Sequence, residues 1–321
     1  MTARVGAIRG VALITAMLVT ALVSLVALDL AARQQLDVRR TSNLLSYDQS
    51  LLYAQGMDAW VTQILVRDRM QGLVDHLGEE WAMHLPPLPV DGGTLIGELV
   101  DQQGLYNLNN LMPNNDGTVN LVERNRFLRL LVTQEIPEDL AGALADALID
   151  WMDPDQDRRF PGGAEDQDYL LLQPPYRAAN APLRSVSELR LVKGFTTEIY
   201  RRIAPFVTAL PVRTAINVNT APLPVLLALI PDLRPLDAEA LIEARGAQGY
   251  RDAQSFINQP PVISRAAELP LQTIDVKTNW FLAHGKATIR NLSIEFYSLL
   301  NRTDANNQVM VRVLQQTQGM L

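Results

Sequence analysis

Cysteine is absent from this 321-residue sequence, and histidine occurs only three times. Without cysteine the chain has no disulfides, no thiolate zinc site, no iron–sulfur cluster and no cysteine nucleophile. His76, His84 and His284 are widely separated, so they are a poor supply for a histidine-based metal site or catalytic triad. The sequence also lacks a glycine-rich nucleotide loop and a nucleophile–base pair, and it therefore does not indicate an enzyme.

Basic residues are outnumbered by acidic ones. The chain has 28 lysines and arginines against 35 aspartates and glutamates, which gives a net charge of −7 and a pI near 5.1. This balance argues against a protein whose main task is to bind phosphate backbones. Hydrophobic residues make up 48% of the chain, which excludes general disorder, and the length suggests about two domains.

The N-terminal segment contains an uncharged apolar run, Val11–Leu28, preceded by Arg4 and Arg9. A helix of this length rises roughly 27 Å, close to the hydrocarbon thickness of a bilayer. Its only polar residues are Thr15, Thr20 and Ser24. Small hydroxyls can bond back to their own helix, and the preceding basic residues favour a cytoplasmic N-terminus. The run therefore predicts a membrane-spanning helix.

A cleaved secretory signal is the alternative, because the segment ALDLAARQQ offers a weak small-residue cut site near Ala32. Continuity argues against it, since the first proline after the run is Pro86 and apolar residues continue at helical spacing. These residues are Leu44, Tyr47, Leu51, Ala54, Met57, Val61 and Ile64. We therefore expect one long helix whose later part packs on the core.

Gly10 lies between the short basic leader and the apolar run, as in the sequence RGVALITAML. This arrangement resembles the type IV prepilin class, in which a leader peptidase cuts after such a glycine. The resemblance implies cleavage between Gly10 and Val11, with Val11 as the new N-methylated terminus. The class usually carries glutamate at the fifth mature position, where this chain has Thr15. A carboxylate buried in the bilayer is costly unless it is paired. The resemblance implies that its partner in the class is the terminal amine of the preceding subunit, so a chain without the carboxylate would suit the tip.

The rest of the chain changes character three times. Residues 86–93 are rich in proline and glycine, and we expect Thr94–Val100 and Leu105–Leu111 to form a β-hairpin. From about residue 118 to 267 the pattern is helical and includes two helical hairpins, 184–207 and 217–245. The C-terminal residues alternate in polarity and predict antiparallel strands that join the hairpin in one sheet.

The second helical hairpin superficially resembles a helix-hairpin-helix module that binds DNA backbones. Its turn, IPDLRPLD, contains no glycine, so backbone amides cannot easily converge on a phosphate. Asp232 and Asp237 would also repel one. A packing module is the better interpretation, and DNA binding stays an alternative.

Residues 146–168 hold eight acidic residues against Arg158 and Arg159. Oxygen ligands in this number suit Ca²⁺, which takes six to eight, better than Mg²⁺. The candidate ligands are Asp153, Asp155, Asp157, Glu165, Asp166 and Asp168. Asp150 is either a further ligand or the last polar residue of its helix. The stretch is no EF-hand, because the sixth position from Asp153 is Arg158 and not glycine. Catalytic carboxylates near Trp151, Phe160, Tyr169 and Tyr176, as in a glycosidase, are a second alternative.

Together these segments resemble the general secretion pathway protein K family, the large minor pseudopilins of type II secretion. The motifs are the leader with Thr15, GELVDQQGLYNLNNLM, DALIDWMDPDQD, GAEDQDY, SVSELRLVKGF and NVNTAP. The resemblance implies an α+β, type IV pilin-like fold, a long helix on a small antiparallel sheet, with a large inserted all-α domain. The expected parts are a leader (1–10), a transmembrane segment (11–28), the rest of the helix (29–85), the sheet (86–117 and 268–321) and the inserted domain (118–267).

The same resemblance implies calcium in the inserted domain and a single-pass protein of the inner membrane whose bulk lies in the periplasm. Its implied partners are the I and J minor pseudopilins, H as well, the major pseudopilin below them and the prepilin peptidase. No nucleic acid is expected. The implied role is to initiate a pseudopilus that supports export of folded proteins, without covalent chemistry. A DNA-uptake or type IV pilus-associated minor pilin is the runner-up.

Overall fold

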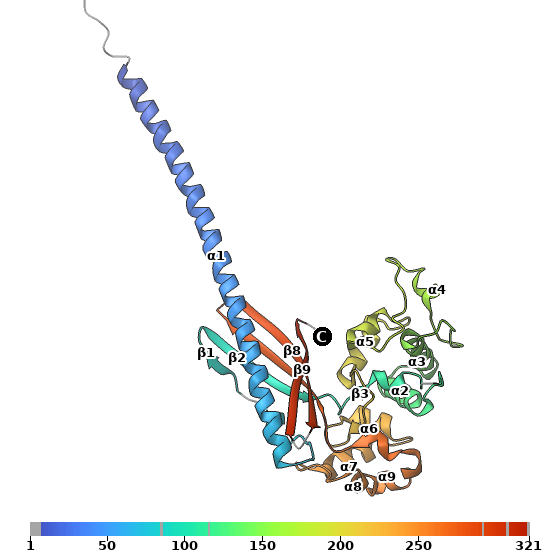
Figure 1. Ribbon diagram of the computed structural model, residues 1–321. Coiled ribbons are helices and arrows are strands. Elements are labelled where there is room, and N and C mark those ends of the chain that lie inside the picture. The colour runs from blue at the N-terminus through green and yellow to red at the C-terminus, as the bar shows by residue number, and fades with distance from the viewer. Residues whose placement is uncertain (1–7, 84–85, 115, 291, 306–307, 320–321) are drawn as a thin grey trace, which may run out of the picture.

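The computed structural model describes residues 8–83, 86–114, 116–290, 292–305 and 308–319. Its longest element is α1, Ile8–Gln71, a single unbroken helix that extends far beyond the rest of the molecule (Figure 1). The helix ends 14 residues before the expected end at residue 85. Gly72 follows it, and the chain then turns so that the Asp75 amide donates to the Val276 carbonyl at 2.9 Å.

A five-stranded antiparallel sheet lies against the C-terminal half of α1 (Figure 1). Its strands are β1 (Leu88–Val90), β2 (Gly93–Asp101), β7 (Trp280–Ile289), β8 (Leu292–Ala305) and β9 (Gln308–Gln318). They are arranged in the order β1-β2-β7-β8-β9, so the first two strands and the last three come from distant parts of the sequence. This confirms the expected fold class: a long helix on an antiparallel sheet, with a helical region inserted between strands.

The helix approaches the sheet closely at a pair of glycines. Gly97 of β2 faces Gly285 of β7 in register, and the Met57 side chain lies over both. A Cβ at Gly285 would lie 2.7 Å from the Met57 sulfur and would overlap the Phe296 ring. The buried face of α1 in this contact comprises Ala54, Met57, Val61, Ile64 and Leu65. Each large apolar side chain buried there contributes about 1.5–3 kcal/mol, which fixes the helix on the sheet.

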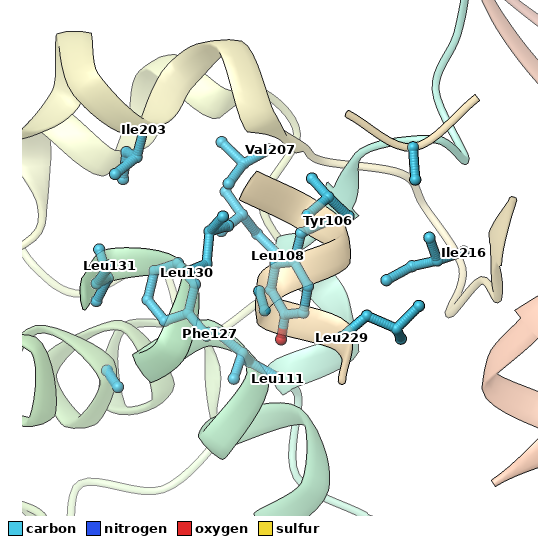
Figure 2. Packing of buried hydrophobic residues seen from close by; sticks show 14 of the residues in the cluster. Tyr106, Leu108, Leu111, Phe127, Leu130, Leu131, Ile203, Val207, Ile216 and Leu229 are labelled. Carbon is cyan, nitrogen blue, oxygen red and sulfur yellow. The ribbon is translucent and has the colours of Figure 1, made fainter. Parts of the chain in front are cut away.

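Helices dominate the inserted region. They are α2 (Leu121–Thr133), α3 (Glu138–Met152), α4 (Asp166–Tyr169), α5 (Thr197–Ile203), α6 (Leu223–Leu229), α7 (Pro235–Arg245), α8 (Ala253–Ile257) and α9 (Pro260–Ile263). Short 3₁₀ helices of the chain are Glu80–Ala82, Leu108–Leu111, Val186–Leu191, Ala204–Phe206, Ala266–Glu268 and Leu271–Thr273. The hydrophobic core of the inserted region is larger than the core between α1 and the sheet. Figure 2 shows Phe127 and Leu130 of α2 packed among the residues of this larger core.

The expected hairpin of residues 94–111 does not form. Thr94–Val100 is part of β2, as predicted, but its partners are β1 and β7. Residues 106–107 form β3, which pairs in parallel with β4 (Val207–Thr208), and a 3₁₀ helix follows. The apolar side chains of this segment, Tyr106, Leu108 and Leu111, are fully buried in the helical core (Figure 2). These side chains are buried in the helical core, and this burial is more favourable than a position in a strand beside β2. The segment therefore leaves the sheet and joins the inserted region.

A second parallel pair closes the insertion, because β5 (Ile216–Asn217) lies beside β6 (Ile274–Asp275). The insertion is also held to the sheet by Asp101, the last residue of β2. Its carboxylate accepts hydrogen bonds from Asn217 Nδ2 at 2.8 Å and Thr220 Oγ1 at 2.6 Å. Buried polar groups that are satisfied in this way orient two packed units relative to each other.

Arg302 of β8 is fully buried where the end of α1 meets the sheet. Its guanidinium lies 2.6 Å from an Asp68 carboxylate oxygen, pairs with Asp75, and donates to the Thr278 carbonyl at 2.9 Å. The guanidinium also lies 4.8 Å above the Phe281 ring. One arginine therefore links the helix, the loop after it, and two strands.

Candidate metal centre and membrane anchor

Three carboxylates converge between α3 and α4. Asp150, Asp153 and Glu165 each offer an oxygen, and these oxygens all lie within 4.8 Å of one another. The three residues are 0%, 0% and 3% exposed. Burial of several carboxylates together is costly unless a cation compensates them.

The local sequence explains this convergence. Asp150 lies in the last turn of α3 and Asp153 is the residue that ends it, so the two share one helix face. The loop then returns through Gly163, where a Cβ would overlap the Asp150 carboxylate and lie 2.6 Å from the Arg159 carbonyl oxygen. Glycine is therefore required for the approach that brings Glu165, the residue before α4, to the cluster.

Arg159 supplies part of the compensation. Its Nη2 lies 2.8 Å from Asp153 Oδ2, its Nε lies 3.2 Å from Asp150 Oδ1, and its backbone amide donates to Asp150 Oδ2 at 3.0 Å. Four carboxylate oxygens are still buried and accept no hydrogen bond from the described residues, although Arg159 Nε lies 3.2 Å from one of them. They are Asp150 Oδ1, Asp153 Oδ1 and both Glu165 oxygens. A single guanidinium thus leaves room for a further cation.

The pKa values of the three carboxyl groups are also consistent with a shortage of positive charge in the cluster. Burial, together with the neighbouring carboxylates of Asp150 and Asp153, raises the pKa of Glu165 to about 7. Burial likewise raises the pKa of Asp150 to about 6 and raises that of Asp153. Without a metal, these groups hold protons more tightly than exposed carboxylates do.

The donor set fits a hard divalent cation. Carboxylate oxygens are the ligands that Ca²⁺ prefers, and one oxygen from each of the three buried residues already lies within 4.8 Å of the other two. Asp150, Asp153 and Glu165 would hold the ion. Its positive charge would compensate the cluster and tie the loop to α3.

The structure brings together only two of the six candidate ligands, Asp153 and Glu165, and it adds Asp150. Asp155 is exposed and accepts a hydrogen bond from the backbone amide of Asp157, which is also exposed. Sequence reasoning left the role of Asp150 open, although its position three residues before Asp153 in a helix places the two side by side.

The remaining two candidates pair with basic residues. Asp166 lies 3.5 Å from Arg177, and Asp168 lies 2.7 Å from the ammonium of Lys193. Arg158 also approaches Asp168 at 3.7 Å. These contacts stabilise the loop around the cluster, and basic partners already compensate both carboxylates.

A second group of acids, Asp68, Asp75 and Glu79, also has oxygens within 4.8 Å of one another. It differs from the first because the buried Arg302 guanidinium pairs with both aspartates. Glu79 accepts from the Trp81 indole at 2.6 Å. These donors account for the cluster as a structural ion-pair network.

Three of the four aromatic residues beside the acidic loop pack on one another, whereas the fourth, Phe160, is exposed. The rings of Trp151 and Tyr169 meet edge to face at 5.1 Å, and Tyr169 stacks on Tyr176 at 5.4 Å. Trp151 and Tyr169 are buried. They form part of the core and do not line a cleft as sugar-binding platforms would.

The turn between α6 and α7 gives no phosphate site either. Arg234, immediately before α7, pairs with Asp237 of its first turn at 2.8 Å. The positive end of this helix therefore already has a carboxylate, which disfavours a phosphate there.

The apolar half of α1 has the composition of a membrane span. The helical segment Val11–Gln71 contains an 18-residue window of mean hydropathy 2.6 that is unburied. Thr15 donates its hydroxyl to the backbone carbonyls of Val11 and Ala12, both at 3.0 Å. Its polar group is satisfied within its own helix. Residues 1–7 of the expected leader lie outside the described residues; Gly10 is within the helix.

Comparisons with known proteins agree with this architecture. Two sequence models described as "Type II secretion system (T2SS), protein K" match residues 104–212 and 216–277. The chain is 42% identical to type II secretion system protein K of Pseudomonas aeruginosa over 254 residues, which cover 77% of this chain and 75% of that protein. It is 34% identical to the Aeromonas hydrophila protein of the same name, over 95% of this chain and 96% of that one.

A solved structure is also similar, the crystal structure of the GspK-GspI-GspJ complex from the type 2 secretion system of enterotoxigenic Escherichia coli. The TM-score is 0.78 at 27% identity, with 88% of this chain and all of that chain covered. Sequence and fold thus lead to the same result. The chain belongs to the type II secretion system protein K family, a family of structural proteins without enzymatic activity.

Proposed function

We propose that this protein is the minor pseudopilin at the tip of the type II secretion pseudopilus, where it initiates assembly. The observation that carries the proposal is the anchor around Thr15. The hydroxyl bonds to its own helix, so the anchor demands no counter-charge from a subunit ahead of it. An anchor with a carboxylate at this depth would be costly without a partner. A subunit with an uncharged anchor can occupy the leading position.

The position of the insertion supports the same role. Helices α7–α9 lie near the C-terminal end of α1, opposite the apolar end (Figure 1). Gly78, shortly after α1, is in close contact with the Ala247 backbone that follows α7. The insertion would obstruct a subunit added beyond this end and leave growth only from the membrane side.

The proposed division of the chain takes its N-terminal bounds from the sequence and the bounds of its inserted domain from the strands. A leader (1–10) would be removed by the prepilin peptidase, which leaves Val11 to be N-methylated. Residues 11–28 would span the inner membrane once, and the remainder would lie in the periplasm. We place the inserted domain between the end of β2 and the start of β7, residues 102–279, which is wider than the 118–267 expected from the helical pattern.

Calcium and the partners complete the proposal. Ca²⁺ would be held by Asp150, Asp153 and Glu165 and would order the loop between α3 and α4. The solved relative is a complex with GspI and GspJ. We propose that this chain assembles with minor pseudopilins of these two types, with the H type also, and with the major pseudopilin below. The complex would support export of folded proteins across the outer membrane.

Thr15→Glu tests the tip role. We expect wild-type protein only at one end of isolated pseudopili, and the glutamate variant also along the shaft, because its carboxylate can pair with the amine of a subunit ahead. The measurement is immunogold labelling of sheared filaments. Thr20→Glu is the control: it adds an unpaired carboxylate, costing about 2.5–3.5 kcal/mol in the bilayer, away from the fifth mature position. Wild-type label at regular intervals along the shaft would refute the proposal.

Gly10→Leu tests processing. A bulky side chain beside the cut should keep the leader attached, so the membrane form should retain the mass of residues 1–10. Intact-mass measurement of the purified wild-type and variant chains decides this, and Gly10→Ala, which changes the position least, should still be cut in part. A wild-type chain beginning near Ala32 would identify an ordinary signal peptide instead.

A further inference from the structure

A groove runs between strand β9 and the inserted region, and we call it the β9 groove. Its outer part is a cavity of about 590 Å³, which continues into one of about 300 Å³ over the sheet. Arg184, Ala209, Leu299 and Gln315 line both parts and make them continuous. The walls are otherwise largely apolar, with prolines at 182, 205 and 211. The groove therefore offers a largely apolar bed, with polar side chains in its inner part that include Gln102, Ser185 and Thr208.

Strand β9 forms one side of this groove and is the last strand of its sheet. Among the described residues no strand pairs with its outer edge. Edge strands are commonly protected by charged side chains, proline or a β-bulge; Gln308–Gln318 has one arginine and one bulge but no lysine or proline. A bulge lies opposite Leu299 and Leu300, and the Leu314 side chain there is 52% exposed and lines the groove. Unpaired backbone amides and carbonyls beside an apolar bed suit an added strand.

The floor of the groove is the sheet face opposite α1. Leu282 and Leu299 are register partners on that floor. Their sequence neighbours Phe281 and Leu300 belong to the core under α1. Because side chains alternate between the two faces of a strand, packing through α1 leaves the groove open. A partner that packs on the helix therefore leaves this groove available to another.

The charge of the groove restricts that partner further. Arg184 is the one charged residue lining either cavity. Its backbone amide donates to Glu188, but among the described residues its guanidinium has no ion-pair partner. A carboxylate on the occupant would complement it.

We infer that the β9 groove binds an extended, acidic segment of a protein outside the pseudopilus. The segment adds to β9 as a sixth strand. Its apolar side chains, on one face, cover Leu314 and Leu299, and a carboxylate pairs with Arg184. The inference rests on the proposed function in one respect: it takes the proteins that pack on α1 to be the other subunits of the pseudopilus.

The test uses the full chain in detergent micelles and a fluorescent, end-blocked peptide of alternating valine and glutamate. We expect saturable binding measured by anisotropy. Arg184→Gln should weaken it about five-fold, the range of an exposed ion pair. Arg251→Gln, an exposed arginine before α8, should leave binding unchanged. A peptide with lysine for glutamate should bind less well. Equal binding of a peptide with proline at alternate positions, which cannot pair with a strand, would overturn the inference.

The absence of cysteine allows a second, independent measurement. Leu314→Cys creates a unique thiol in the groove, and Leu236→Cys creates one on the exposed start of α7. The peptide should slow maleimide labelling of the first thiol and not of the second. Unchanged labelling at 314 would overturn the inference. In cells, cross-linking from position 314 to I- or J-type pseudopilins would also overturn it, whereas the labelling of filament ends tests the tip role separately.

Discussion

Arg302→Met is expected to lower the free energy of unfolding by about 3–5 kcal/mol, the cost of removing one partner from a buried ion network. The substitution retains an apolar stem of similar length but leaves the carboxylates of Asp68 and Asp75 facing each other without their shared guanidinium. The backbone carbonyl of Thr278 also loses a donor. Arg69 still donates to the Thr278 carbonyl at 3.0 Å and lies 3.9 Å from Asp75, whereas Asp68 loses its only ion-pair partner among the described residues.

Thermal unfolding of the full chain in detergent measures the effect, and we expect the midpoint to fall by roughly 10 °C. Arg312→Met is the matched control, because Arg312 is exposed on β9 in register with Asn301, next to Arg302. Its midpoint should change by less than about 2 °C. A triple variant that combines Arg302→Met with Asp68→Asn and Asp75→Asn should recover part of the lost stability, because it removes the two buried negative charges left without Arg302. Equal midpoints for the two arginine variants would refute the structural role of the network.

The sequence could indicate this network only weakly. The burial alternation of β8 places Phe296, Ser298 and Leu300 on the inner face, and Arg302 continues the series. An arginine at an inner position predicts a buried partner. The sequence does not identify that partner, because Asp68 at the end of α1 and Asp75 in the loop after it lie 234 and 227 residues away from Arg302.

The spacing of apolar residues predicted a helix or strand correctly where the tertiary contacts of that segment follow the same spacing. Spacings of three and four residues placed Met57 and Val61 on the packed face of α1, and strict alternation predicted β9. The same reasoning gave a wrong prediction for the segment Leu105–Leu111, which is not the second strand of a hairpin. Its apolar residues fit a strand equally well, and only the presence of a larger core beside it decided otherwise.

The acidic loop was predicted by composition, but its geometry was not. Charge counting cannot distinguish Glu165, which turns inward, from Asp168, which pairs with Lys193 at the surface. The difference depends on the path of the loop, and Gly163 sets that path by permitting contact with Asp150. A more useful signal was the position of Asp150, one helical turn before Asp153.

Chelation is the second large effect that we expect. If Asp150, Asp153 and Glu165 hold Ca²⁺, a metal-loaded protein at 100 times the dissociation constant gains about 2.7 kcal/mol, and EDTA should remove it. The midpoint of thermal unfolding should then fall by about 5–10 °C and recover on addition of excess Ca²⁺. Glu165→Gln should abolish the response. Glu239→Gln, an exposed acid of α7, should preserve it.

The pH dependence separates metal binding from a general effect of the chelator. The raised pKa values, about 7 for Glu165 and about 6 for Asp150, favour the protonated carboxyls in the metal-free fold. The metal-free protein therefore loses stability as pH rises through this range, because the buried groups become charged. Ca²⁺ binds the charged forms, so its affinity rises over the same range. The fall caused by EDTA should be larger near pH 8 than near pH 5.5. An equal fall at both values, or protein without bound metal by native mass spectrometry, would remove calcium from the proposal and leave Arg159 as the only cation of the cluster.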